Sequence, residues 1–286
     1  MPYFNKGAHI VNISSMGGFQ GSLSSVSATE LGSVAIQEAV TRAGIKADDV
    51  QEVIMGNVLP AGLKQGPARQ ASRQAGLPDA TGCTTINKLC GSGMKAAMLA
   101  HDLIKAGTNN VMVAGGMESM SNAPYILLNA RKGYRMGHGD KAMDHMFLDG
   151  LEDAETGRLM GSFAQDVASQ KGYTREEMDN YAINSLRRAQ KAIEEGRFDK
   201  EIAPLAGLTM DETPRQSSLE KMAELEGIFG CDKVTAAVSS QTCDGSSAVL
   251  VVSQLVRLSE VLVTFGITLE NILLPFLFFD LKLLLV

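Results

Sequence analysis

The side chain with the greatest potential for chemistry in this sequence is the thiol of Cys90. It stands in the segment Asn-Lys-Leu-Cys-Gly-Ser-Gly, between a predicted strand at 84–86 and a predicted helix at 94–106. A turn at that place exposes the sulfur at the carboxyl edge of a sheet, and the start of a helix stabilises a thiolate. The two glycines leave room for an acyl group and for backbone N–H donors. From residue type alone a buried, inert cysteine is the better interpretation, and the strand–turn–helix context makes nucleophilic catalysis about equally good.

The other candidates for chemistry are weaker. Four residues could be imagined as metal ligands: His138, Asp140, Asp144 and His145. Nothing in their spacing fixes a coordination geometry, so a solvated loop is the favoured interpretation. Cys83 and Cys243 are interpreted as core or loop thiols, and Cys231 belongs to no motif. The cysteines form no CxxC pair, which indicates a reducing compartment.

The elements that would position Cys90 alternate between strands and helices. The segment from Ser27 to Glu30 has the pattern of a capping box that opens a helix, and Gly44 is placed to end it. Next come a strand at 53–55 and a helix at 67–75. They are followed by the two elements around Cys90 and by a returning strand at 111–114. This order is typical of an α/β fold with a parallel sheet. Because the helix at 94–106 is apolar around most of its circumference, we expect it to lie between two layers.

The second half of the chain begins with a long excursion from this sheet, at 117–172, which has few periodic runs. A helix with a capping box follows at Thr174, and Gly196 ends it. Its predicted apolar face consists of Met178, Tyr181, Ala182, Leu186, Ala189 and Ile193. A buried strand at 246–252 is then expected to rejoin the first sheet.

Charge and the last segment restrict the classes of partner. The net charge of −6 argues against a nucleic-acid-binding protein. From about residue 254 the sequence is far more apolar than before, but Glu270, Asp280 and Lys282 interrupt it and Pro275 breaks its best stretch. A membrane span is therefore disfavoured, and we interpret 254–286 as a divergent terminus that replaces another one.

Several blocks of the sequence resemble the thiolase family. The segment Asn87-Lys-Leu-Cys-Gly-Ser-Gly-Met-Lys-Ala96 looks like its nucleophile block, and Gly115-Gly-Met-Glu-Ser-Met-Ser-Asn-Ala-Pro-Tyr125 looks like a second block. The pair Gly56-Asn-Val-Leu59 and Pro67-Ala-Arg-Gln70 resembles a third. With the smaller matches, the resemblance runs from about Met16 to Ser253 and is closest to acetyl-CoA acetyltransferases.

The resemblance implies a two-step exchange with Cys90 as nucleophile. Its thiolate would attack an acyl-CoA, and the carbanion of a second acetyl-CoA would take the acyl group; the reverse reaction cleaves a 3-ketoacyl-CoA. CoA thioesters are then the substrates, with no permanently bound cofactor and no metal, and Met160 and Ser240 match CoA-contacting positions. The resemblance further implies a homo-oligomer. Residues 120–139 match a region that helps relatives form tetramers, and an ordinary surface loop is an equally good interpretation of them. We expect a cytoplasmic protein.

The implied fold is the N-terminal half of a thiolase, a mixed sheet flanked by helices. Residues 1–119 with 246–253 would form the α/β domain, 120–245 an inserted loop domain and 254–286 the divergent tail. The helix after Cys90 would be the central layer of the family's five-layered fold. Without the second half, we expect a wide apolar face to be exposed.

The sequence also departs from the family pattern. Three family blocks that supply the other catalytic groups, Asn-Glu-Ala-Phe, Gly-His-Pro and Cys-x-Gly-Gly-Gly, do not occur in it. Glu226 stands where relatives have a CoA-contacting arginine, and Leu159 stands where they have a histidine. We therefore expect acylation without ordinary turnover, and the alternative hypothesis is an incomplete thiolase that binds CoA or partner subunits without catalysis.

Overall fold

The computed structural model describes residues 10–15, 21–138, 141–254 and 256. The predicted tail at 254–286 lies almost wholly outside these residues, as does Asp140. No helix in the described ranges is both long enough and apolar enough to cross a lipid bilayer.

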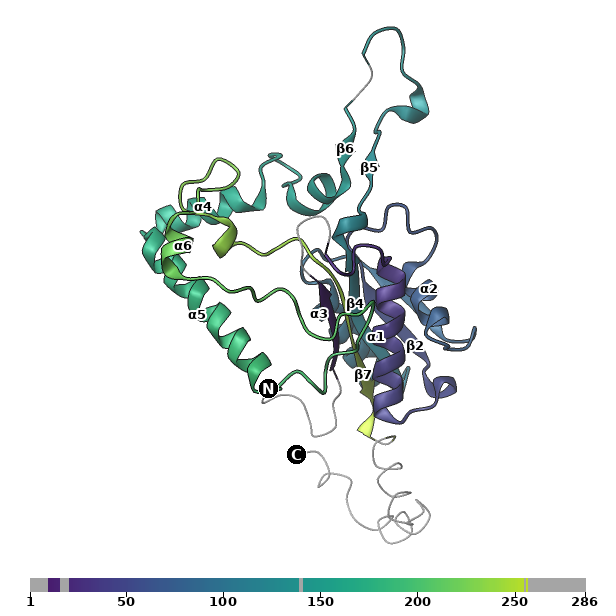
Figure 1. The fold of residues 1–286 in the computed structure, drawn as a ribbon. Coiled ribbons are helices and arrows are strands. Elements are labelled where there is room, and N and C mark those ends of the chain that lie inside the picture. The colour runs from purple at the N-terminus through teal and green to yellow at the C-terminus, as the bar shows by residue number, and fades with distance from the viewer. Residues whose placement is uncertain (1–9, 16–20, 139–140, 255, 257–286) are drawn as a thin grey trace, which may run out of the picture.

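A five-stranded mixed sheet forms the centre of the molecule (Figure 1). Its order is β1 (Ile10–Ser15), β7 (Asp244–Val252), β4 (Val111–Ser119), β2 (Glu52–Gly56) and β3 (Gly82–Ile86). The strand β2 runs parallel to β3 and β4, whereas β7 runs antiparallel to β4 and β1. The predicted strand at 246–252 does rejoin the sheet. It is antiparallel because the excursion leaves at Ser119 and returns at Asp244, which are paired at the same edge.

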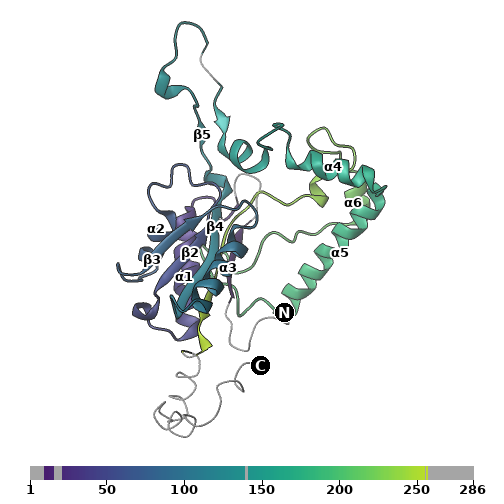
Figure 2. The ribbon, with the colours of Figure 1, turned by 180° about the vertical axis from the view of Figure 1, so that it is seen from behind.

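Helices cover both faces of this sheet, α1 (Ala28–Ala43) and α2 (Pro67–Gln74) on one and α3 (Ser92–Lys105) on the other (Figure 2). Alternate strand residues explain the division, since neighbours along a strand point to opposite faces. Val53 and Val113 belong to the core under α1, while Ile54 and Met112 belong to the core under α3.

The boundaries of α1 follow the predicted signals. The Ser27 hydroxyl accepts from the Glu30 N–H, and the Glu30 carboxylate accepts from the Ser27 N–H, which completes a capping box. The helix ends at Gly44, whose φ of 71° is left-handed.

The outer face of α3 is exposed. Ala96 and Ala100 are fully buried against the sheet, but Met94 is 74% and Met98 52% exposed. The expectation of a helix between two layers is therefore wrong for the described residues, because only the sheet covers α3 there. The expected exposed apolar face is present instead.

The excursion contains short elements followed by longer helices. Its two-stranded sheet, β5 (Tyr125–Ile126) with β6 (Met143–Asp144), forms the base of a projecting arm. The helices are α4 (Met160–Gln170), α5 (Arg175–Glu194) and α6 (Leu219–Ala223), and a π-helical turn spans Met146–Leu151. Short 3-10 turns lie at Ala47–Asp49, Met120–Asn122, Ala130–Lys132 and Ala236–Val238.

The helix α5 begins as predicted, but the side chains that it buries are not those of the predicted apolar face. Thr174 and Glu177 form the expected capping box. The buried side chains are those of Asp179 and Ile183, whereas Tyr181, placed on the predicted apolar face, is 80% exposed. The carboxylate of Asp179 is buried because it pairs with Arg175 at 3.0 Å, one turn earlier.

Candidate active site

A tight turn connects the end of β3 to the start of α3 and carries Cys90. Leu89, just before it, has a φ of 48°, which is left-handed and uncommon for a residue other than glycine. Two side chains hold this backbone. The Asn87 Oδ1 accepts from the Leu89 N–H at 2.9 Å. The buried Ser92 hydroxyl accepts from the Lys88 N–H at 2.8 Å and donates to the Leu89 carbonyl at 2.6 Å.

Glycines bring the start of α3 against the strands. A Cβ on Gly56 in β2 would lie 2.5 Å from the Cβ of Ser92 and 2.9 Å from the nitrogen of Gly93. A Cβ on Gly93 would meet only the backbone of Gly115 and Gly116 in β4, at 3.8 Å or more. The turn can therefore sit directly on the strand ends because Gly56 has no side chain.

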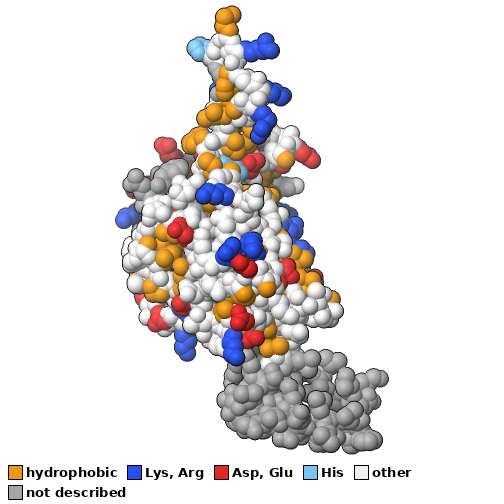
Figure 3. Space-filling model, turned by 90° about the vertical axis from the view of Figure 1, so that its right-hand side faces the viewer, with side chains coloured by type: hydrophobic (Ala, Val, Ile, Leu, Met, Phe, Trp, Pro, Cys, Tyr) orange, Lys and Arg blue, Asp and Glu red, His pale blue; other side chains and the backbone are white. Residues whose placement is uncertain are grey.

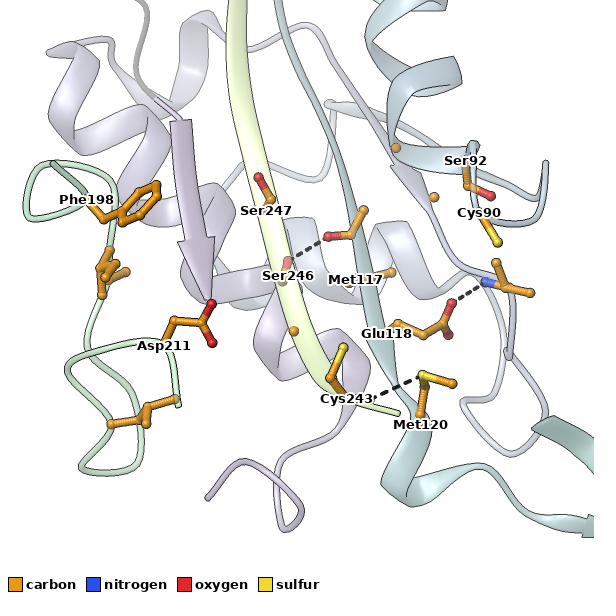
Figure 4. Close-up of a pocket in the computed structure, with 18 of the residues that line it drawn as sticks. Cys90, Ser92, Met117, Glu118, Met120, Phe198, Asp211, Cys243, Ser246 and Ser247 are labelled. Atoms are coloured by element: carbon orange, nitrogen blue, oxygen red, sulfur yellow. Dashed lines mark hydrogen bonds between the residues drawn. The ribbon is translucent and has the colours of Figure 1, made fainter. Parts of the chain in front are cut away.

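Cys90 is exposed and lies on the wall of a pocket of about 480 Å³ (Figure 4). Three other regions complete that wall: the end of β2 with Val58 beyond it, the ends of β4 and β7, and a segment of the excursion between Phe198 and Asp211. Figure 4 shows Cys90 and Ser92 on one side of this space and Phe198 and Asp211 on the other. The interpretation of Cys90 as a buried cysteine is therefore wrong, and its role as a nucleophile stays a prediction.

Glu118, near the end of β4, is a largely buried carboxylate in the same pocket. Its Oε2 accepts from the Val58 N–H at 2.8 Å. Its Oε1 accepts from Asn57 Nδ2 at 2.7 Å and from the Leu59 N–H at 3.1 Å. Burial raises the pKa of Glu118 above its ordinary value, although these N–H donors act in the opposite direction.

A second thiol, Cys243, also lines the pocket. Burial raises its pKa, and the carboxylates of Asp244, Asp211 and Glu118 add to the effect. A thiol with a raised pKa is a poor nucleophile at neutral pH because little thiolate forms. Cys243 therefore contributes to the wall and is not a second candidate nucleophile.

The two predicted CoA-contacting residues lie outside this pocket. Met160 is the first residue of α4 and is 47% exposed, and Ser240 is exposed in the segment that leads to β7. Their assignment to CoA stays a prediction. Glu226, the departure from the family pattern, is also exposed in the excursion.

No metal site forms in the part of the chain that the structure describes. The buried ring of His145 is engaged elsewhere, because its Nδ1 lies 2.7 Å from the Asp149 carboxylate and its Nε2 accepts from the Ala61 N–H. Those contacts connect the excursion to the loop after β2.

Sequence reasoning missed Glu118, Asp211 and Cys243 as pocket residues; Cys243 is a loop thiol, as one of its two interpretations had it. The available signal for Glu118 was its position directly after the apolar strand and the glycine pair Gly115–Gly116. Asp211 and Cys243 carry no such signal, because the excursion brings them to the pocket from distant parts of the sequence.

Comparison with known proteins agrees with the fold. A family model described as the N-terminal domain of thiolase matches residues 10–255. An acetyl-CoA acetyltransferase from Cupriavidus necator is 45% identical over 249 residues, which are 83% of this chain and 63% of that relative. Acetyl-CoA acetyltransferase 2 from Arabidopsis thaliana is 46% identical over 250 residues, or 83% of this chain and 62% of the relative. This chain thus matches less than two thirds of the length of these relatives.

A solved structure gives the same result. A thiolase from Ascaris suum, crystallised in complex with coenzyme A, superposes with a TM-score of 0.82 at 36% identity, covering 91% of this chain and 67% of that one. The mixed α/β fold expected from the sequence is confirmed. Family model, relatives and superposition agree on one conclusion: the chain belongs to the thiolase family.

Proposed function

We propose that this protein is an acyl-CoA acyltransferase whose nucleophile is Cys90. The Cys90 thiolate attacks the thioester carbonyl of an acyl-CoA. A new carbon–sulfur bond forms to the protein, the carbon–sulfur bond to CoA breaks, and CoA leaves as a thiolate that takes up a proton. The products are acyl-Cys90 and free CoA.

One observation carries this proposal: the exposed thiol of Cys90 stands two residues before α3, on the wall of a pocket. The first N–H groups of a helix have no partners within the helix and carry partial positive charge. They can stabilise the oxyanion that develops when the sulfur attacks a carbonyl. The apolar wall around Phe198 and Met210 suits an acyl group.

Acetyl-CoA is the proposed acyl donor. The relatives named above are acetyl-CoA acetyltransferases, and the Ascaris suum thiolase was solved with coenzyme A. The second step of the proposed reaction joins the acyl group to another acetyl-CoA, or cleaves a 3-ketoacyl-CoA in reverse. Met160 and Ser240 are proposed to contact the CoA moiety, outside the pocket that receives the acyl group.

A homo-oligomer is proposed from the arm. Figure 3 shows apolar and basic side chains along this projection. Its exposed large apolar residues are Tyr125, Leu127, Leu128, Tyr134 and Met136. Apolar side chains on a projecting segment are suited to contact with another subunit. The expected cytoplasmic location stays a prediction, since a similar acetyl-CoA acetyltransferase from Bos taurus is a mitochondrial protein, whereas the Cupriavidus necator relative is bacterial.

The alternative, a thiolase chain that binds CoA or partner subunits without turnover, is favoured by the uncovered face of α3 and by the residues of the pocket. Met94 and Met98 are available to a partner on that face. Among the described residues that line the pocket there is no histidine to act as a base near Cys90.

The test is incubation of the 286-residue protein with acetyl-CoA, followed by intact-mass measurement and peptide mapping. We expect one acetyl group on Cys90, and none after Cys90→Ser. The control Cys83→Ser changes a thiol at 3.4 Å from the Thr81 carbonyl, a contact that a hydroxyl can keep, and it should acetylate normally. CoA binding without any acetyl-enzyme would favour the alternative and overturn covalent transfer.

A further inference from the structure

Glu118 is a largely buried carboxylate whose hydrogen-bond partners all lie in one loop. It receives three N–H groups from Asn57, Val58 and Leu59, with donor–acceptor distances between 2.7 and 3.1 Å. A carboxylate that accepts several N–H groups forms stronger bonds than a neutral acceptor would. Figure 4 shows Glu118 reaching from β4 toward the side of the pocket where Cys90 lies. Such an arrangement fixes the loop after β2.

The orientation of Asn57 supports this assignment. Its Nδ2 donates to Glu118 Oε1 at 2.7 Å and to the Met117 carbonyl at 3.2 Å. Its Oδ1 is buried and has no hydrogen-bond partner among the described residues. An unpaired buried oxygen is costly, so the carboxylate, and not the needs of the amide itself, sets how this side chain is turned.

The same loop is tied to the segment that precedes Cys90. The Asn57 N–H donates to the Ile86 carbonyl at 3.0 Å, beyond the last pair of β2 and β3. Asn87 Nδ2 donates to the Val58 carbonyl at 3.4 Å. The other end of the Asn87 amide, Oδ1, accepts from the Leu89 N–H. A continuous series of hydrogen bonds therefore runs from Glu118 to the turn.

That turn depends on its surroundings. Leu89 has a φ of 48°, and a non-glycine residue holds such a conformation only where neighbouring contacts impose it. Asn87 supplies one of those contacts. Loosening the loop under Asn87 would let Leu89 relax toward ordinary φ values and would move the adjacent Cys90.

We propose that Glu118 is a positioning residue for Cys90, acting through the 57–59 loop and Asn87 to hold the Leu89–Cys90 turn. The consequence for acyl transfer rests on the proposed function of Cys90, whereas the consequence for the turn does not. Reactions between a bound thioester and a nucleophile are sensitive to displacements on the order of 1 Å, for which losses of about a hundredfold are typical.

The test uses the full chain with Glu118→Gln, which keeps the shape of the side chain. Its amide has one acceptor oxygen, and its NH₂ group would face N–H donors. Two readouts are made on the same samples: hydrogen exchange at the backbone amides of residues 87–92, and the single-turnover rate of Cys90 acetylation. We expect the Leu89 amide to lose protection and acetylation to slow by roughly tenfold to a hundredfold.

Two further variants separate positioning from general loss of stability. Asp244→Asn is the matched control, because Asp244 is a buried carboxylate held by Ser119 and Ser121 and is not bonded to the 57–59 loop. It should leave exchange in the turn unchanged. Asn87→Ala tests the connection: if Glu118 acts through Asn87, the losses from the two substitutions should not add in the double variant.

The outcomes distinguish the two proposals. Unchanged protection at Leu89 in Glu118→Gln, or additive losses with Asn87→Ala, would overturn the positioning role while leaving Cys90 chemistry intact. A wild-type protein that never acetylates Cys90, but whose turn loses protection in Glu118→Gln, would overturn the proposed function and support the positioning of the turn.

Discussion

At the scale of single residues, the Ser92 hydroxyl holds the turn at Cys90 from the helix side. In Ser92→Ala the Lys88 N–H loses its acceptor, whereas the Leu89 carbonyl keeps the Ser92 N–H at 3.0 Å. Leaving a donor unpaired costs about 1–3 kcal/mol. We therefore expect a loss of that size in the free energy of unfolding, measured by urea denaturation, together with slower acetylation of Cys90.

The control for that substitution is Ser33→Ala. The Ser33 hydroxyl also donates to a carbonyl three residues earlier, that of Glu30, but in an exposed part of α1. Its loss should change the free energy of unfolding much less, because water replaces the bond. Equal effects of the two substitutions would contradict a special role for Ser92.

Glu118 gives a pH dependence of stability whose sign can be stated. Because burial raises its pKa in the folded state above the ordinary 4.5, the folded protein holds this proton more tightly than the unfolded chain. The stability that the Glu118 carboxyl contributes is fully present below pH 4.5. It is lost as the pH rises through the pKa of Glu118 in the folded state. Wild type should therefore lose stability relative to Glu118→Gln as the pH rises through that range, measured by urea unfolding at several pH values.

Glu30 provides the opposite case. The hydrogen bonds of Glu30 with Ser27 lower the pKa of its carboxyl. The stability that Glu30 contributes is therefore present at pH values above the ordinary pKa of a glutamate, and it is lost as the pH falls through the lowered pKa. Wild type should therefore lose stability relative to Glu30→Gln as the pH falls, the reverse of the result expected for Glu118→Gln.

The outcome that would contradict the prediction for Glu118 is a parallel pair of stability–pH curves for wild type and Glu118→Gln. Such curves would show that burial does not control the titration of Glu118.

Residue types and order were enough to single out Cys90, but not its supports. The strand–turn–helix pattern predicted an exposed thiol because it depends only on neighbours in the sequence. The roles of Glu118 and Asn87 depend on the 57–59 loop meeting both β4 and the turn. That contact joins segments about 30 and 60 residues apart, which no local pattern reports.

At the scale of elements, Gly56 lets β2 touch the start of α3. A methyl group in Gly56→Ala would lie 2.5 Å from the Ser92 Cβ and 2.8 Å from the Ser92 backbone carbon. Overpacking against backbone costs about 1–3 kcal/mol or more, and here it would push α3 and Cys90 away from the strands. We expect lower thermal stability, measured by circular dichroism, and slower acetylation.

Gly150→Ala is the matched control for that substitution. Its methyl group would meet only a methyl of Leu59 at 3.5 Å, which is ordinary contact. A protein in which Gly56→Ala is as stable and as reactive as Gly150→Ala would show that the close approach is not required.

The existence of most elements was predictable, and their ends were less so. Capping boxes defined the starts of α1 and α5 because the signal lies within four residues. The predicted strand at 111–114 in fact continues to Ser119, because β7 pairs with it across the glycine pair. The predicted apolar face of α5 was wrong at Tyr181 because tertiary contacts, including those of Arg175 with the Met222 and Leu225 carbonyls, decide which side of that helix is covered.

At the scale of the whole molecule, a central five-stranded sheet carries helices on both faces, and the outer face of α3 exposes apolar side chains. Leu89 in the Cys90 turn is 53% exposed. In α3, Met94 is 74% exposed and Met98 is 52% exposed. Apolar side chains gathered on one face promote association, because burying them removes them from water. The chain should therefore self-associate through α3 when no other surface covers it.

The corresponding test is the double substitution Met94→Lys with Met98→Lys. Lysine keeps the helix propensity of methionine, so α3 should persist while its outer face becomes charged. We expect the concentration-dependent increase in sedimentation coefficient to fall, without loss of helical circular dichroism. Tyr181→Lys replaces an apolar residue that is 80% exposed on α5, away from that face, and should leave association unchanged. If the double variant associates as strongly as wild type, another surface, such as the arm, is responsible, because two like charges on α3 would oppose contact through it.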